Sequence, residues 1–364
     1  MAINSIDSQL GDIIDPKLRK IGERVVRQLE LAADKVAAHA ADAARFPLPT
    51  QRDSAENILA AWFDTMPERK RAAAGVAAIR RVNTTAIRTA HLGELAGVDL
   101  QTRTPIASQG SAFAIPNLKF SAADLAKLQN SAFLGTLGGM IPQHAPARAT
   151  RSDSLLLRVT QIRCANETNS PFGGHIGEDD MWLGGTSVDE SGDTKTIKPI
   201  KLGSFDNKDV KHYNPPRTFT NFNITERGNS FPKAYLVTLV LVERDNGKAM
   251  QTFLDRVTKE IKKQVQDALV KVGKTTGGSF GLVVGTIAAW VFGELIDYIS
   301  SGWRDTVFRP LTVTAHIGSY DSVWVSSGRK DSTDRMLETK APQARYQLWY
   351  DWLLYNSAAG LGII

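Results

Sequence analysis

Small residues at every fourth position mark the stretch between Lys274 and Arg304, which contains no basic residue. These small residues are Gly277, Gly281, Gly285, Ala289 and Gly293. A spacing of four places them along one stripe of an α-helix, beside large apolar residues such as Trp290. Because glycine inside a helix costs roughly 1 kcal/mol relative to alanine, the repeat needs a structural reason. The usual reason is close approach to another helix, often in a membrane, so we predict helix association through this stripe.

Two interpretations of this stretch remain open. Gly277 to Gly293 comprises 17 uncharged residues, which is at the lower edge of the length that spans a bilayer. Glu294 and Asp297 follow one turn apart, so a permanent membrane span is a poor description. A helix buried on all sides within a water-soluble fold has the same composition. The alternative is a conditional span that leaves such a fold, as helical hairpins do in membrane-inserting toxins.

The preceding segment, from about Lys248 to Val272, has the pattern of a basic amphipathic helix. Its apolar positions include Phe253 and Val257, and its polar face carries lysines such as Lys259 and Lys263. Such a helix can lie on an anionic membrane surface. It can equally cover the core of a folded domain. Together with the glycine stripe it predicts a helical hairpin over about 248–303.

Hydrophobic periodicity divides the rest of the chain into two parts. Residues 1–130 contain several helical patterns, and 131–153 resembles a linker because it has glycines, prolines and few charges. From 154 to 355 the pattern changes to about eight short strands separated by turn residues. We therefore predict an α+β multidomain protein, with an N-terminal α-helical domain followed by an antiparallel β-sandwich that carries the inserted hairpin.

Composition limits the classes of function. The chain has 364 residues, 42% of them hydrophobic and 23% charged, which is typical of a globular protein. Its net charge of +6 divides into +4 for residues 1–150 and +2 for the remainder. A basic excess spread so thinly does not indicate specific nucleic-acid binding. The single cysteine, Cys164, excludes an intrachain disulfide. We see no secretory signal, so we expect synthesis in the cytoplasm and any export by a non-classical route.

Acidic residues recur where predicted strands end. They are Glu167, Asp179, Asp180, Glu243, Asp245 and Asp305. Calcium prefers six to eight hard oxygen ligands, and loops at one end of a β-sandwich converge in space. These residues are therefore candidate ligands of a calcium ion. The other interpretation of each residue is a solvent-exposed turn.

Two of these acidic motifs carry a resemblance to a known family. GEDDMWLGG is similar to the strand start of calcium-dependent phospholipid-binding β-sandwiches, the C-two domains, and LVLVERDNG resembles their strand leading into an acid-x-acid loop. Met181 stands where that family has proline, and Glu243 where it has aspartate. The resemblance covers about 154–355. It implies that the hairpin is inserted in a loop that such domains present to membranes.

The sequence contains no phosphate-binding glycine loop, nucleophile elbow or zinc-protease motif. We therefore predict a non-enzymatic, membrane-active protein of the toxin or effector kind, with membrane lipid or a protein as partner and possible homo-oligomers. The second hypothesis is a soluble structural or interaction module, such as a cargo or scaffold component, whose hairpin is permanent core. A third is a hydrolase whose site the sequence does not reveal; substitutions of His175 and Asp179, a pair that could serve acid–base chemistry, would test it.

Overall fold

The computed structural model of the chain describes residues 2–3, 5–8, 16–110, 151–166, 179–226, 228, 231, 233–243, 247–272, 280–303, 308–341 and 344–357. Within these ranges a helical region is followed by two antiparallel sheets, so the fold is mixed α+β, as predicted. The predicted linker lies largely outside the described residues, and the division into domains therefore stays a prediction.

The N-terminal region contains five α-helices and a 3₁₀ helix in its described part. They are α1 (Pro16–Ala41), α2 (Ala55–Phe63), α3 (Glu68–Asn83), α4 (Thr85–Leu92), η1 (Gly93–Gly97) and α5 (Ile106–Gly110). Ser54 caps α2, since its side chain accepts a hydrogen bond of 3.3 Å from the backbone N–H of Asn57. The cap satisfies one of the unpaired donors at the start of this short helix.

Most of the strands follow these helices in the chain. They are β1 (Ala2–Ile3), β2 (Ser5–Ser8), β3 (Ser154–Asn166), β4 (Asp179–Val188), β5 (Thr194–Phe205), β6 (Val210–Asn223), β7 (Lys233–Glu243), β8 (Leu311–Ile317), β9 (Val323–Trp324), β10 (Arg335–Ala341) and β11 (Ala344–Tyr355). One sheet has the order β10-β11-β3-β6 and the other β2-β8-β7-β4-β5, while β1 pairs with β9 in parallel. The two larger sheets share one hydrophobic core.

The first residues of the chain differ from the prediction. The predicted helical domain began at residue 1, whereas Ser5–Ser8 pair antiparallel with Thr312–Ala315 of β8. This pairing satisfies backbone groups that the edge of the sheet would otherwise leave unpaired. The N-terminal segment thus belongs to the sheet that the C-terminal half builds.

Strand β7 is buried on both faces, which explains its nearly continuous apolar sequence. Tyr235, Val237 and Leu239 face the core between the two sheets. Val240 and Val242 belong instead to a second core, which is formed mainly by helices. The five-stranded sheet therefore lies between the other sheet on one side and helices on the other.

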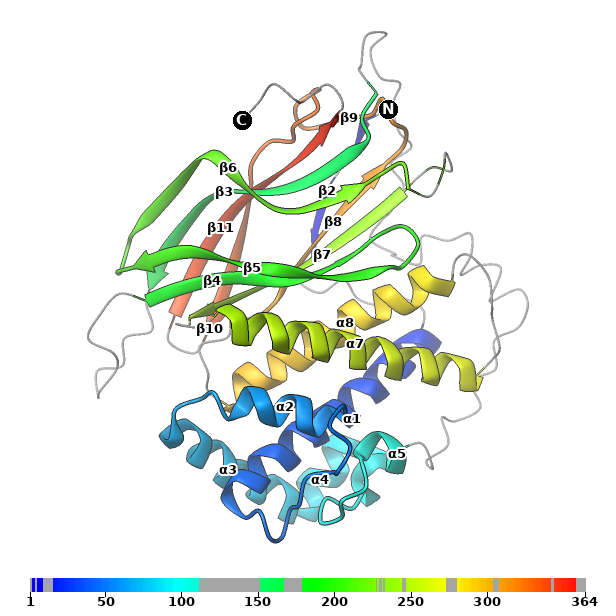
Figure 1. Cartoon of the computed structure of the whole chain (residues 1–364), viewed down its shortest axis with the longest axis vertical. Coiled ribbons are helices and arrows are strands. Elements are labelled where there is room, and N and C mark those ends of the chain that lie inside the picture. The colour runs from blue at the N-terminus through cyan, green and yellow to red at the C-terminus, as the bar shows by residue number, and fades with distance from the viewer. Residues whose placement is uncertain are drawn as a thin grey trace.

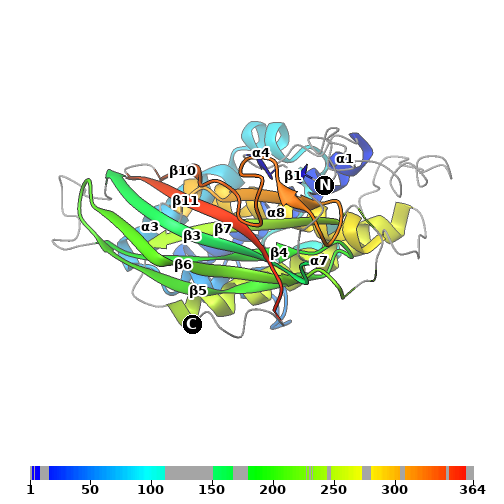
Figure 2. The same ribbon diagram turned by 90° about the horizontal axis from the view of Figure 1, so that it is seen from above.

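Two long helices, α7 (Gly247–Val272) and α8 (Phe280–Trp303), contact each other and cover this sheet. Figure 1 shows them between the strands and the N-terminal helices, and Figure 2 shows β5, β6 and α7 on one side of the molecule. Helix α7 contacts β5 and α2, while α8 contacts β4, α1 and α3. The N-terminal helices consequently share one hydrophobic core with α7 and α8.

Candidate functional site

Helix α8 is the element that the glycine stripe singled out. Its segment Val283–Ser301 has 19 residues with a mean hydropathy of 1.4, so it is long and apolar enough to cross a membrane by length and composition. About 76% of this segment is buried inside the protein, and the core helix of a water-soluble protein passes the same test. The helix lies between the five-stranded sheet and α1. This position explains an apolar sequence on every side.

Gly285, one member of the glycine stripe, allows α8 to approach the sheet. A Cβ atom on Gly285 would lie 2.6 Å from Cγ1 of Val188 and 2.9 Å from the carbonyl oxygen of Gly192. Ala289, one turn later, packs against Val188 and Leu236. The close approach that we expected between two helices is, at Gly285, an approach between a helix and the end of a strand. Helix association through the stripe in lipid stays a prediction.

The other predicted members of the stripe have different surroundings. Gly293 is buried, and Trp290 is half-buried and packs against the helical core. Gly281 lies within α8, but its surroundings are not described, and Gly277 lies outside the described residues.

Polar groups join the second half of α8 to the N-terminal helices. The hydroxyl of Tyr298 donates to Oδ1 of Asp34 at 2.9 Å, and Arg81 Nε donates to the same atom at 3.1 Å. Nearby, His91 Nε2 lies 2.9 Å from Oε2 of Glu30. Burial raises the pKa of Glu30, while the adjacent His91 acts in the opposite direction. This network could not be predicted from local spacing in the sequence, because its members come from four separate helices, α1, α3, α4 and α8.

The predicted calcium ligands are brought together only in part. Met181 pairs with Glu243, so Asp180 and Glu243 occupy neighbouring register positions at the ends of β4 and β7. Asp180 accepts hydrogen bonds of 2.6 Å from both Lys201 Nζ and Ser204 Oγ. These hydrogen bonds lower the pKa of Asp180, and the ammonium of Lys201 compensates its negative charge.

The side chains of the remaining predicted calcium ligands fall outside the part of the chain that the structure describes. Glu167, Asp245, Asp305 and the side chain of Asp179 lie outside what the structure describes, as does His175. Among the described side chains, no group of three or more His, Cys, Asp or Glu residues is arranged to hold a metal ion. Calcium binding therefore stays a prediction.

A groove of about 230 Å³ opens where the edges of the two sheets meet. The start of β5 and the end of β6 line it, and its charged residues are Asp189, Asp193, Lys195, Lys198 and Glu226. Asp189 is engaged within its own turn, since its Oδ1 accepts from the backbone N–H groups of Ser191 and Asp193. Lys195 and Lys198 are exposed. The polar lining suits a charged ligand better than an apolar one.

A buried lysine stands close to this groove and serves the fold. Lys233 Nζ donates to Glu190 Oε1 at 3.0 Å and to the carbonyl oxygen of Ile224 at 2.6 Å. Its ammonium also lies 5.3 Å from the centroid of the Phe231 ring. The ion pair with Glu190 and the hydrogen bond to Ile224 offset the free-energy cost of removing the Lys233 ammonium from water.

Comparison with known proteins adds no family: no family model, curated protein or solved structure matches the chain.

Proposed function

We propose that this protein is a non-enzymatic, membrane-active protein of the toxin or effector kind. The two sheets form a β-sandwich that docks on a membrane, and α7 with α8 forms a helical hairpin that then inserts. The resemblance of residues 154–355 to C-two domains supports the docking role, and calcium is a possible ligand in it. In this proposal the inserted hairpins associate into homo-oligomers.

One observation carries this proposal. The segment Val283–Ser301 is a candidate membrane span that a folded protein keeps 76% buried. Its burial depends on contacts with elements distant in the chain, α1 and the sheet. If those contacts are lost, α8 exposes apolar surface to water. Transfer of that surface from water into lipid then lowers the free energy. Glu294 and Asp297, near the end of the helix, would stay at the interface, because carboxylates are costly within hydrocarbon.

The same burial also favours the alternative function. A helix packed on all sides is what a permanent core helix requires, so the chain can act as a soluble structural or interaction module of a larger assembly. Such a module would not bind liposomes with or without calcium. It would form a stable assembly with itself or with a protein partner.

A pair of matched tyrosine variants tests the proposed insertion. Tyr298 and Tyr320 each donate a hydroxyl hydrogen bond, at 2.9 Å to Asp34 and at 2.7 Å to the carbonyl oxygen of Gly228. Removal of one such bond costs about 1 kcal/mol, which corresponds to about a fivefold change in an equilibrium. Of these two bonds, that of Tyr298 is the one that joins α8 to α1.

We therefore expect Tyr298→Phe to speed dye release from anionic liposomes about fivefold, and Tyr320→Phe to leave the rate unchanged. The measurement is fluorescence of a self-quenched dye, repeated with a calcium chelator. No release by the unmodified protein, or equal rates for the two variants, would favour the interaction module instead.

A further inference from the structure

Positive charge is concentrated on two segments that lie side by side. Residues 194–217, which span β5 and the first half of β6, contain six Lys or Arg and two Asp or Glu. Helix α7 contains six Lys or Arg and three Asp or Glu. The two segments therefore have net charges of +4 and +3. All other residues of 151–364 sum to −5. The modest net charge of this part of the chain therefore conceals a strong separation of charge.

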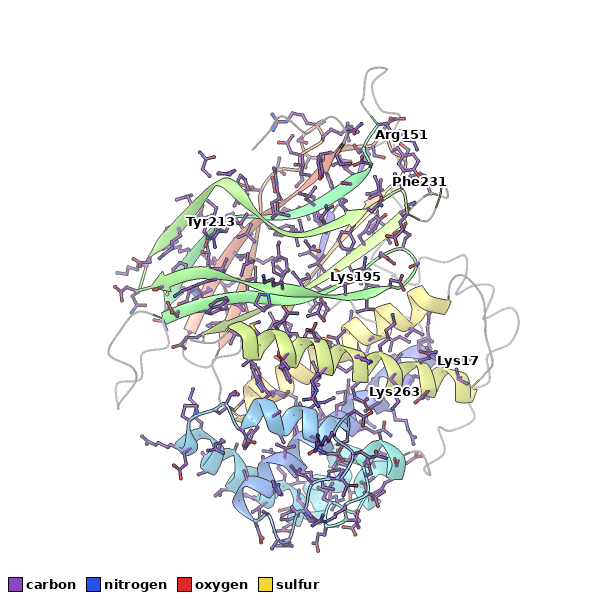
Figure 3. All side chains as sticks on the ribbon, viewed as in Figure 1. Lys17, Arg151, Lys195, Tyr213, Phe231 and Lys263 are labelled. Atoms are coloured by element: carbon purple, nitrogen blue, oxygen red, sulfur yellow. The ribbon has the colours of Figure 1, made fainter. Side chains whose placement is uncertain are left out.

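The fold places both segments on one face. Strand β5 contacts β6 on one side and α7 on the other, and the three elements lie along the same side of the molecule in Figure 2. Lys262 Nζ approaches the carbonyl oxygen of Gly192 at 3.4 Å, just before β5 begins. Figure 3 labels Lys195 at β5 and Lys263 at α7.

The cations of this face are available to a partner. Lys195, Lys198, Lys259 and Lys263 are exposed. Within the described residues, none of them forms an ion pair with a carboxylate within 4.0 Å, in contrast to Lys201, whose Nζ lies 2.6 Å from Asp180. Arg217 donates to the carbonyl oxygen of Lys201 and lies over the Tyr213 ring, so its charge also stays uncompensated by an acid.

We propose that this cationic face, formed by β5, β6 and α7, is the surface that docks on anionic phospholipid membranes. The inference rests on the proposed function and gives it a docking surface that needs no calcium. Negatively charged headgroups attract clustered Lys and Arg side chains, and each contributes about fivefold to binding near the membrane surface. Membrane lipid fits better than nucleic acid, because the Tyr213 ring at this face is covered by Arg217 and offers no platform for stacking bases.

This surface also relates docking to insertion. Helix α7 belongs to the cationic face, and α8 packs directly against α7. A protein docked by this face therefore has the candidate span one helix away from the headgroups. Acidic loops at the ends of β4 and β7 are not required for that orientation.

The test compares two triple charge reversals in the full chain. Lys195→Glu, Lys198→Glu and Lys259→Glu together change the cationic face, while Lys20→Glu, Arg69→Glu and Lys340→Glu change three exposed cations on α1, α3 and β10 by the same total charge. Flotation with phosphatidylserine–phosphatidylcholine vesicles, in chelator, measures binding. Circular dichroism checks that both variants fold.

We expect the unmodified protein to bind these vesicles, and the bound fraction to fall as the salt concentration is raised. It should not bind vesicles of pure phosphatidylcholine. The face variant should bind about 100-fold more weakly, and the control variant about as well as the unmodified protein. Equal binding by both variants, or no vesicle binding by the unmodified protein, would overturn the inference. So would tight binding of a mixed-sequence DNA duplex without vesicle binding. Flotation without dye release would support the docking surface and reject hairpin insertion, so the two proposals fail separately.

Discussion

At the scale of single residues, Gly285 explains how α8 can lie so close to the sheet. A methyl group at this position would meet Val188 and the backbone of Gly192, and the backbone cannot move aside without disturbing the turn between β4 and β5. In an ordinary helix interior, Gly→Ala stabilises by about 1 kcal/mol. Here overpacking costs about 1–3 kcal/mol and should outweigh that gain.

We therefore expect Gly285→Ala to lower the free energy of unfolding, whereas helix propensity alone predicts an increase. Urea denaturation checks the sign, through a lower midpoint at an unchanged slope. Gln266→Ala, at an exposed position of α7, serves as control and should change stability by less than about 0.5 kcal/mol. A stabilised Gly285→Ala protein would contradict the close packing.

We expect His316 in β8 to make the protein sensitive to acid. Burial lowers its pKa from 6.5 to about 4, and its Nε2 has no hydrogen-bond partner among the described residues. Because the unfolded chain takes up the proton at higher pH than the folded chain, stability is lost as pH falls from about 6.5 towards 4.

We expect the unmodified protein to lose roughly 2 kcal/mol more stability between pH 7 and pH 5 than His316→Leu, which cannot be protonated there. Urea denaturation at the two pH values measures this difference. Parallel losses in the two proteins would mean that other groups dominate the response to acid.

At the scale of elements, the sequence pattern located most strands and both long helices. The predicted strand runs LLLRVTQIRC, MWLGGTSV and AYLVTLVLVE, which begin at Leu155, Met181 and Ala234, lie in β3, β4 and β7. The predicted hairpin segment corresponds to α7 and α8. Alternation succeeds where one face or both faces of a strand are buried, because burial selects apolar residues. It did not find β10, where Met336 is exposed and Thr339 is buried, so polarity and burial do not correspond.

For the candidate sites too, the local sequence pattern predicts only features that lie within one segment of the chain. The spacing of small residues identified α8, because both the glycine stripe and the apolar residues beside it lie in one continuous segment. The contact of Tyr298 with Asp34 joins positions 264 residues apart, and spacing along the chain carries no information about it. Charge totals for two halves of the sequence also concealed the cationic face, because they averaged α7 and β5 with acidic segments.

At the scale of the whole molecule, the helical layer is shared by the two ends of the chain. Trp62 of α2 stacks on Phe253 of α7 with ring centroids 4.4 Å apart, and Arg256 donates to the carbonyl oxygen of Arg52 at 2.8 Å. Buried residues of α1 belong to the same core as Ile287 and Leu295 of α8. If the hairpin inserts in a membrane, the N-terminal helices lose a large part of the surface on which they pack.

In the isolated fragment 1–130, the N-terminal helices lack α7 and α8, as they would after insertion of the hairpin in a membrane. We expect it to unfold without a cooperative transition and to bind a hydrophobic dye, because α1 and α2 then expose apolar side chains that α7 and α8 cover in the full chain. Near-ultraviolet circular dichroism and dye fluorescence during urea denaturation measure this, with the full-length protein as control. A fragment that unfolds cooperatively would instead establish an independent helical domain, which could remain folded while the hairpin leaves.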